Sequence, residues 1–195
     1  MKINKKRIKI ISRPFLVLKM KKIIFSLLIA FSALFILTAC YSNQDVKIEQ
    51  KGIKYYKSHE YEKALITLKE AADSGSASAA YYLGKMYGNG EGVKKDDELS
   101  FKWYLKAAEK GDIQSVKLVG SSYYLGRGVT QDYKEALKWF LKAAEKIDIS
   151  QPAENDISLM AIIADMYLLG RGTMQDFSEA AKWFEKAGSY GNVRS

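Results

Sequence analysis

Cysteine and histidine are nearly absent from this sequence, and their scarcity limits the chemistry that it can carry. Cys40 is the only cysteine among 195 residues, and His59 is the only histidine. No disulfide can therefore form within the chain. A zinc site is equally hard to assemble, because cysteines and histidines are the usual zinc ligands. We predict no metal and no cofactor, and we expect His59 to be a surface residue in a short turn between helices.

Acidic residues are absent from the first 39 positions, and this absence explains the basic net charge. The formal charge is +9, from 31 lysines and arginines against 22 aspartates and glutamates. Nine of the basic residues lie in residues 1–39, which leaves 22 basic and 22 acidic residues in the remainder. Because the chain after residue 39 has no net charge, it has no excess of basic residues to bind the phosphates of a nucleic acid. We therefore predict no nucleic-acid partner.

The first 39 residues have the pattern of a secretory signal peptide. Two lysines precede the uncharged run Ile23–Ala39, IIFSLLIAFSALFILTA, which ends in small residues. A positive segment, an apolar segment and a small-residue cleavage site are typical of exported proteins. An uncleaved anchor is the alternative, although the run is shorter than the roughly 20 residues of a usual membrane span. Translation from Met20 would leave residues 1–19 unused, whereas translation from Met1 would extend the basic segment.

The residues before Cys40 indicate a lipid anchor. Leu37-Thr38-Ala39-Cys40 resembles a bacterial lipobox. The resemblance implies a lipoprotein that is cleaved before Cys40 and acylated on it, with residues 40–48 as the lipidated cysteine and a short linker. Two or three acyl chains would hold it at a membrane. An ordinary thiol behind a plain signal is the alternative. Tyr41 is not the aspartate that retains enteric lipoproteins at the inner membrane, so we predict an outer-membrane site facing the periplasm if the source is Gram-negative.

Four residue types recur at fixed spacing after residue 75 and define an internal repeat. Each tryptophan lies seven residues after an aspartate, and each aspartate lies nine residues after a tyrosine, with two glycines between them. The first step is 36 residues and the second is 44, so eight residues are inserted, within Asp148–Asp156. The recurring positions are Tyr87, Gly90, Gly92, Asp96 and Trp103; Tyr123, Gly126, Gly128, Asp132 and Trp139; and Tyr167, Gly170, Gly172, Asp176 and Trp183.

Each unit divides into two helices joined by the glycine-bearing loop. The first glycine ends the first helix, because it accepts a conformation that other residues resist. The aspartate begins the second helix, because its carboxylate can accept from the exposed amides of the first turn. Asp132 with Glu135, and Asp176 with Glu179, have the spacing of capping boxes. The apolar stripe that follows must be buried against a neighbouring unit, so we predict a stacked array.

A weaker unit precedes these three and has neither the tryptophan nor the paired glycines. It contains Gly52, two tyrosines and the Ala71-Ala72 pair, and it reads as an opening cap. The predicted units are about 49–75, 78–111, 114–147 and 157–191. If Pro152 is a first-turn residue, the insert lengthens the next helix by about two turns.

Three phrases carry a family resemblance that covers roughly residues 49–191. They resemble Sel-one-like repeats of the tetratricopeptide superfamily: LGKMYGNGEGVKKDDELSFKWYLKAAEKG, VGSSYYLGRGVTQDYKEALKWFLKAAEK and IADMYLLGRGTMQDFSEAAKWFEKAGSYG. The resemblance implies an all-α fold, a right-handed α-solenoid of about four helix-turn-helix repeats and about eight helices, which serves as an interaction scaffold. Ala164 departs from the pattern, because Gly84 and Gly120 stand at the corresponding positions.

An enzyme is the alternative function. A cysteine-rich bacterial branch of the family carries a β-lactamase label, but the paired cysteines of that branch are absent here. The Ser-x-x-Lys and Lys-Thr-Gly motifs of serine β-lactamases do not occur after the signal segment. The glycine pairs lack the preceding strand and the following Lys-Ser/Thr of a phosphate loop. The repeated aspartates lie one unit apart, where each has a capping role. We predict no catalytic residue.

The scaffold interpretation places the binding surface on the first helix of each unit. Positions beside Leu83 that face away from the second helix are expected to line a concave surface for a protein or peptide partner in the cell envelope, with envelope assembly as one variant. An ordinary solvated face is the alternative. The last helix is expected to expose an edge that invites self-association. The candidate partner-binding residues are Tyr81, Lys85, Lys117, Ser121, Ala161 and Asp165.

Overall fold

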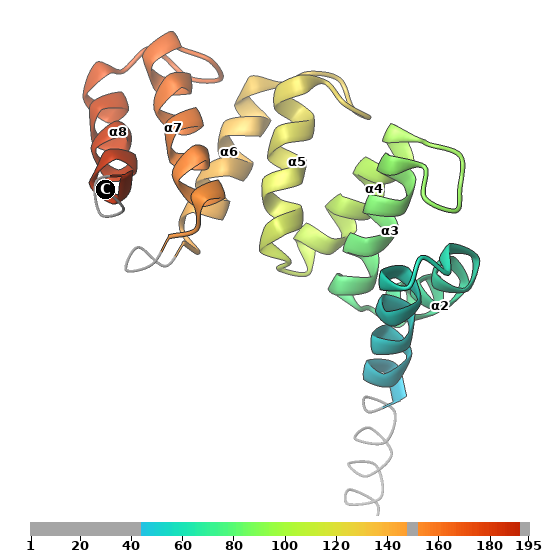
Figure 1. The fold of residues 1–195 in the computed structure, drawn as a ribbon. Coiled ribbons are helices and arrows are strands. Elements are labelled where there is room, and N and C mark those ends of the chain that lie inside the picture. Colours follow the sequence, from blue (N-terminus) through green and yellow to red (C-terminus); the bar gives the residue numbers. More distant parts are fainter. Residues whose placement is uncertain (1–43, 148–151, 192–195) are drawn as a thin grey trace, which may run out of the picture. The chain divides into compact units, whose positions relative to one another are not determined.

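The computed structural model of the chain describes residues 44–147 and 152–191. Over these residues the protein is an all-α array, as predicted, with eight helices and no strand (Figure 1). The signal segment and Cys40 lie outside the described residues. Residues 44–57 are helical, and the helices that follow are α2 (Tyr61–Asp73), α3 (Ala77–Asn89), α4 (Asp97–Glu109), α5 (Ile113–Leu125), α6 (Tyr133–Ala144), α7 (Glu154–Leu169) and α8 (Phe177–Gly191).

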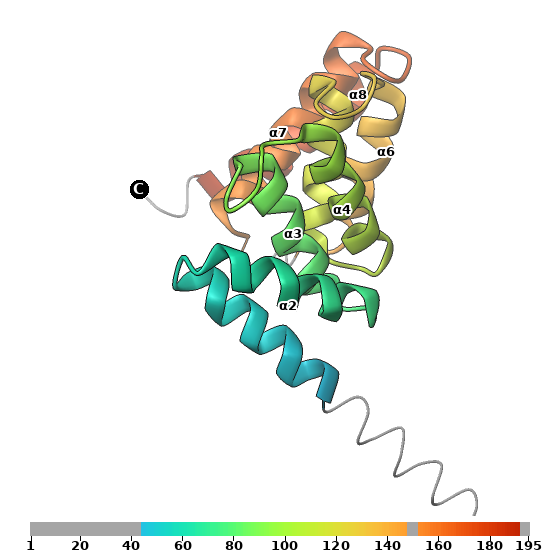
Figure 2. The ribbon, with the colours of Figure 1, turned by 90° about the vertical axis from the view of Figure 1, so that its right-hand side faces the viewer.

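The helices form four consecutive pairs: residues 44–57 with α2, α3 with α4, α5 with α6, and α7 with α8. From α2 onward, each helix packs against the next one in the chain, and Figure 2 shows α2 beside the helix of residues 44–57. Ser76 and Asp112 cap the first helices of the second and third pairs, by accepting from Ala79 N at 2.9 Å and Ser115 N at 2.7 Å. Residues 44–48, predicted to be linker, are already helical, because no glycine or proline interrupts the helix there.

The glycine-bearing loop closes through one backbone hydrogen bond in each of the last three units. The N–H of the aspartate donates to the carbonyl of the tyrosine nine residues earlier, at 2.9 Å for Asp96 to Tyr87 and 3.0 Å for Asp176 to Tyr167. Gly90, which ends α3, adopts a left-handed φ of 74°. The fixed tyrosine-to-aspartate spacing is therefore a requirement of the loop geometry.

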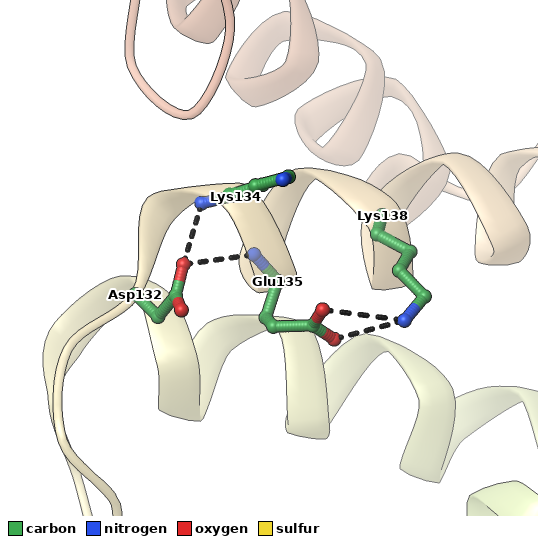
Figure 3. Close-up of polar contacts among 4 residues, drawn as sticks. All are labelled: Asp132, Lys134, Glu135 and Lys138. Carbon is green, nitrogen blue, oxygen red and sulfur yellow. Dashed lines mark hydrogen bonds and ion pairs between the residues drawn. The ribbon is translucent and has the colours of Figure 1, made fainter.

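The aspartates cap the second helices as predicted, but the predicted capping boxes are wrong. Oδ1 of Asp132 accepts from the backbone N–H groups of Lys134 and Glu135 at 2.9 and 3.0 Å (Figure 3). Glu135 cannot return a bond to the N–H of Asp132, because that N–H already donates to Tyr123. Glu135 instead pairs with Lys138 at 3.2 Å.

The second glycine of each pair marks the contact between consecutive units. A Cβ on Gly128 would collide with the carbonyl oxygen of Asp97, and a Cβ on Gly172 with that of Tyr133. Each loop therefore lies directly on the first turn of the second helix of the preceding unit. Only a residue without a side chain permits this approach.

The insert lengthens the first helix of the fourth unit less than predicted. α7 has 16 residues, against 13 in α3 and α5. Pro152 is not in its first turn, because Ala153 is the N-cap and the helix begins at Glu154. The gain is three residues, about one turn. Residues 148–151 lie outside the described residues.

In the third unit a buried aromatic ring packs against a glycine of the first helix, whereas the equivalent ring of the fourth unit is more exposed. A Cβ on Gly120 would lie 2.6 Å from the Phe140 ring, so the glycine lets that ring pack closely. Phe140 is accordingly 2% exposed. Ala164 carries a Cβ at the corresponding position, and the equivalent ring, Phe184, is 41% exposed. α8 thus leaves an aromatic side chain partly exposed, and self-association through this helix stays a prediction.

Candidate partner-binding face

Tyr81 and Lys85, two of the candidate partner-binding residues, lie one turn apart on α3. The ring of Tyr81 is 5.4 Å from that of Tyr82 and 6.0 Å from that of Tyr104, between centroids. Burial raises the pKa of the half-buried Tyr81. Nζ of Lys85 lies 5.9 Å from the Tyr81 ring centroid and 5.2 Å from that of Tyr56. The two candidates thus belong to a cation–π cluster between α3 and the preceding first helix.

Lys117 is engaged within the chain. Its Nζ forms an ion pair with Oδ1 of Asp156 in the first turn of α7, and the two side chains are only 13% and 15% exposed. The other oxygen of Asp156 accepts from the N–H of Ala153 at 3.0 Å. Lys117 therefore ties α5 to α7 across the insert, and its charge is directed into the protein.

The remaining candidates are not brought into one cluster. The hydroxyl of Ser121 donates to the Lys117 carbonyl at 3.0 Å and lines a pocket described below. Ala161 is half-buried and Asp165 is exposed, one turn apart on α7. The side chain of Asp165 forms no hydrogen bond or ion pair with the rest of the described chain, so this carboxylate is accessible to solvent.

Three junctions join the four units, and a tyrosine fills the first of them, between residues 44–57 and α3. The ring of Tyr56 lies 5.8 Å from that of Tyr61 and 4.9 Å from that of Tyr82. Its hydroxyl donates to Oε2 of Glu91 at 2.7 Å. Burial, and then the hydrogen bond to Glu91, raise the pKa of Tyr56.

A second tyrosine fills the third junction, between α5 and α7. The ring of Tyr124 lies 5.3 Å from that of Tyr133 and 6.3 Å from that of Phe140. Nη1 of Arg171, in the glycine-bearing loop, donates to the Tyr124 hydroxyl at 2.6 Å. The arginine also covers the Tyr133 ring, 5.5 Å from its centroid. Ring and hydroxyl are thus both satisfied within the chain.

The second junction, between α3 and α5, contains a pocket instead. Its volume is about 200 Å³, and it opens beside Gly88. The lining residues that matter here are Asp97, Ser100, Tyr104, Leu118, Ser121 and Arg127. The buried hydroxyl of Ser100 donates to the Gly84 carbonyl at 2.8 Å, so this polar group is satisfied. Burial, and then the neighbouring Tyr81, raise the pKa of Tyr104 to about 12.

The described residues offer little chemistry outside this face. They contain no group of three or more His, Cys, Asp or Glu side chains placed to hold a metal ion. No helix among them combines the length and apolar character needed to cross a bilayer. His59 is exposed as expected, with Nδ1 2.7 Å from the Tyr61 hydroxyl.

The repeat pattern, the loop geometry and the paired helices agree with a comparison against protein-family models. The Sel1 repeat model matches residues 77–112, 117–148 and 158–192. The chain belongs to the Sel1 repeat family. Sel1 repeat proteins are in general interaction scaffolds rather than enzymes. No curated protein matches the chain.

Solved structures of Sel1 repeat proteins are similar to this one. A Sel1 repeat protein from Oxalobacter formigenes is 32% identical with a TM-score of 0.62, over 74% of this chain and 56% of that chain. The protective antigen c5321 of uropathogenic Escherichia coli, which displays an SLR fold, is 26% identical with a TM-score of 0.66, over 75% of this chain and 31% of that one. This Sel1 repeat chain therefore spans about half and about a third of the two proteins.

Sequence reasoning missed the residues that decide whether a junction is filled. Tyr56, Tyr124, Gly88 and Arg127 were not among the candidates. For Gly88 and Tyr124 a signal exists two residues before the first glycine of each pair, where the second unit has the glycine and the third has the tyrosine. Comparing that column between units, rather than searching for what repeats, would have found the difference.

Proposed function

We propose that this Sel1 repeat protein is an exported, lipid-anchored scaffold that binds a protein partner along its first helices. The second junction supports this proposal, because it leaves a pocket at the position that Tyr56 and Tyr124 occupy in the other two junctions. Leu125 lies at the rim of this pocket and is 60% exposed. An exposed apolar side chain beside a pocket with polar walls is typical of a protein interface.

Position-specific photo-crosslinking in cells tests the binding face. A benzoylphenylalanine at Leu125 should crosslink a partner, because that side chain borders the pocket. The same residue at Ile66, which is 71% exposed on α2, is the matched control. Equal crosslinking from both positions would contradict a specific face. Crosslinked enzymes of envelope polysaccharide or peptidoglycan synthesis would identify an envelope-assembly role.

Replacing an exposed apolar side chain with a charged one gives a second test of the same face. Leu125→Lys should reduce recovery of the crosslinked partner, whereas Ile66→Lys should not. Lysine suits the last turn of α5, where Leu125 lies, so the fold should persist. Lys117 is unsuitable for this test, because its ion pair with Asp156 makes any loss of binding ambiguous.

The anchor is proposed from the lipobox-like tetrapeptide that ends at Cys40. Metabolic labelling with palmitate should mark the wild-type chain and not Cys40→Ser. Label retained by Cys40→Ser would refute lipidation at this residue. In a Gram-negative cell, membrane fractionation should place the wild type at the outer membrane, and Tyr41→Asp should move it to the inner membrane. Nitrocefin hydrolysis by the purified chain, above the rate in buffer, would instead favour the β-lactamase alternative.

A further inference from the structure

We propose that the second junction binds a tyrosine side chain of the partner protein. This inference rests on the proposed scaffold function and specifies the chemistry that the partner must offer. The first and third junctions serve as two internal templates, since each holds a tyrosine in the corresponding place. The pocket between α3 and α5 is the place where the chain itself supplies none.

Close-packed glycines set the register between the three junctions. A Cβ would lie 2.8 Å from Leu68 on Gly52, 2.6 Å from Tyr104 on Gly84, and 2.6 Å from Phe140 on Gly120. These partner positions are separated by the 36-residue repeat, so the three glycines are equivalent. Four residues after each glycine stand Tyr56, Gly88 and Tyr124, respectively. Gly88 therefore occupies the tyrosine position of the other two junctions.

A second difference accompanies Gly88. A Cβ at this position would lie 2.8 Å from Oγ of Ser100, which is buried and bonded to the Gly84 carbonyl. The equivalents of Ser100 are Ala64 and Ala136, which have no hydroxyl. The two units that carry a tyrosine therefore have an alanine at this second position, whereas the unit that carries Gly88 has a serine there.

Two walls of the pocket are formed by side chains at the positions that contact the tyrosine rings in the first and third junctions. Tyr104 is the equivalent of Phe140, which packs against the ring of Tyr124 at 6.3 Å. Leu118 is the equivalent of Tyr82, which packs against the ring of Tyr56 at 4.9 Å. The volume of about 200 Å³ is below the roughly 300–1,000 Å³ of drug-sized ligand sites, and it suits a single side chain.

The loop residue of the pocket supplies the partner for the hydroxyl. Arg127 is the equivalent of Arg171, which donates to the Tyr124 hydroxyl at 2.6 Å, and of Glu91, which accepts from Tyr56. Arg127 lines the pocket and is exposed. Asp97 replaces the aromatic rings of Tyr61 and Tyr133, so one side of the pocket is open and charged. A phenol from outside would enter there and accept a hydrogen bond from Arg127.

Small tyrosine analogues test the pocket without a partner. The full-length chain is titrated with N-acetyl-L-tyrosine amide and with its phenylalanine and alanine counterparts, and NMR shifts of the pocket residues are followed. Tyrosine amide should saturate the shifts about tenfold more tightly than phenylalanine amide, because a hydrogen bond from a charged donor is lost with the hydroxyl. Arg127→Met should abolish that difference, whereas the matched variant Arg171→Met should keep it. No saturation by tyrosine amide, or equal binding of all three amides, would overturn the proposal.

Filling the pocket from within provides the second test. Gly88→Tyr with Ser100→Ala recreates the arrangement of the other junctions, and Gly88→Ala with Ser100→Ala controls for the loss of glycine. The tyrosine variant should melt at least about 2–4 °C above the alanine control and lose tyrosine-amide binding. An equal melting temperature, or retained binding, would refute a tyrosine-shaped pocket. Partner crosslinking that is unchanged by the tyrosine variant would refute this inference and leave the proposed function standing. Tyrosine-amide binding without any crosslinked partner would refute the proposed function, and only the preference of the pocket for a phenol would remain.

Discussion

Replacing each glycine of one loop with alanine separates the two reasons for having a glycine pair. Gly126 and Gly128 have nearly the same left-handed φ, 68° and 71°. A Cβ on Gly126 would lie 3.3 Å from its nearest neighbour, the Cβ of Gln131 in the same loop. A Cβ on Gly128 would instead collide with the Asp97 carbonyl of the preceding unit. The two substitutions therefore share the backbone strain and differ in the contact between units.

The magnitudes follow from this difference. Gly126→Ala should cost about 1–2 kcal/mol, the usual penalty for a side chain in the left-handed region. Gly128→Ala should cost the same amount plus about 1–3 kcal/mol for the collision with Asp97, because a backbone carbonyl cannot rotate away as a side chain can. We therefore expect a total loss of about 2–5 kcal/mol for Gly128→Ala.

Urea-induced unfolding followed by far-ultraviolet circular dichroism measures both losses. Gly126→Ala should lower the midpoint and leave the slope unchanged, because the units remain coupled. Gly128→Ala should lower the midpoint further and also reduce the slope, since weakened contact between units lets parts of the array unfold separately. Equal losses with equal slopes would refute the conclusion that the second glycine exists for the contact between units.

Three further predictions concern burial, charge and pH. Phe140→Ala should cost about 3–5 kcal/mol, whereas Phe184→Ala should cost less than half as much, because the rings are 2% and 41% exposed; thermal unfolding of both variants measures the difference. A double-mutant cycle with Lys117→Met and Asp156→Asn should give a coupling of about 1–3 kcal/mol, and a coupling near zero would mean that the largely buried pair does not tie α5 to α7. Burial raises the pKa of Tyr104 to about 12 in the folded chain, against about 10 when unfolded, so the unfolded state loses this proton first and stability falls as the pH rises from about 10 to 12. Tyr104→Phe should remove part of that alkaline loss, and an unchanged pH profile would contradict the burial of this hydroxyl.

The units, the helix pairing and the capping aspartates could be predicted because each depends on residues close together in the sequence. A tyrosine, two glycines and an aspartate within ten positions build one loop, and the backbone bond from Asp132 to Tyr123 fixes their spacing. The same local reasoning failed at Glu135, because that bond already uses the N–H that a capping box needs. It also failed at Pro152, because helix propensity does not determine at which residue a helix begins after an insert, and α7 begins only at Glu154.

The contents of the junctions could not be predicted in the same way, because each junction combines residues of two units that are far apart in the sequence. Tyr124 meets Arg171, and Lys117 meets Asp156, across 47 and 39 residues, respectively. The first unit also has a shorter loop, in which Glu60 N–H donates to Tyr55 rather than to a residue nine positions back. Tyr56 is therefore out of register with Gly88 in any alignment at a constant step. The close-packed glycines restore that register only once the structure is known.

The unfilled junction has a consequence for the energetics of binding. Full burial of an aromatic side chain contributes roughly 1.5–3 kcal/mol, and the half-buried Tyr56 and Tyr124 keep part of this contribution within the chain at the first and third junctions. The second junction lacks it, although its backbone contact through Gly128 and the buried Ser100 hydroxyl hold the walls in place. A partner ring would therefore enter a preformed pocket and gain burial without the cost of reorganising the array. The free energy of burying an aromatic ring at the second junction does not stabilise the free array, and it contributes to the affinity when the partner binds.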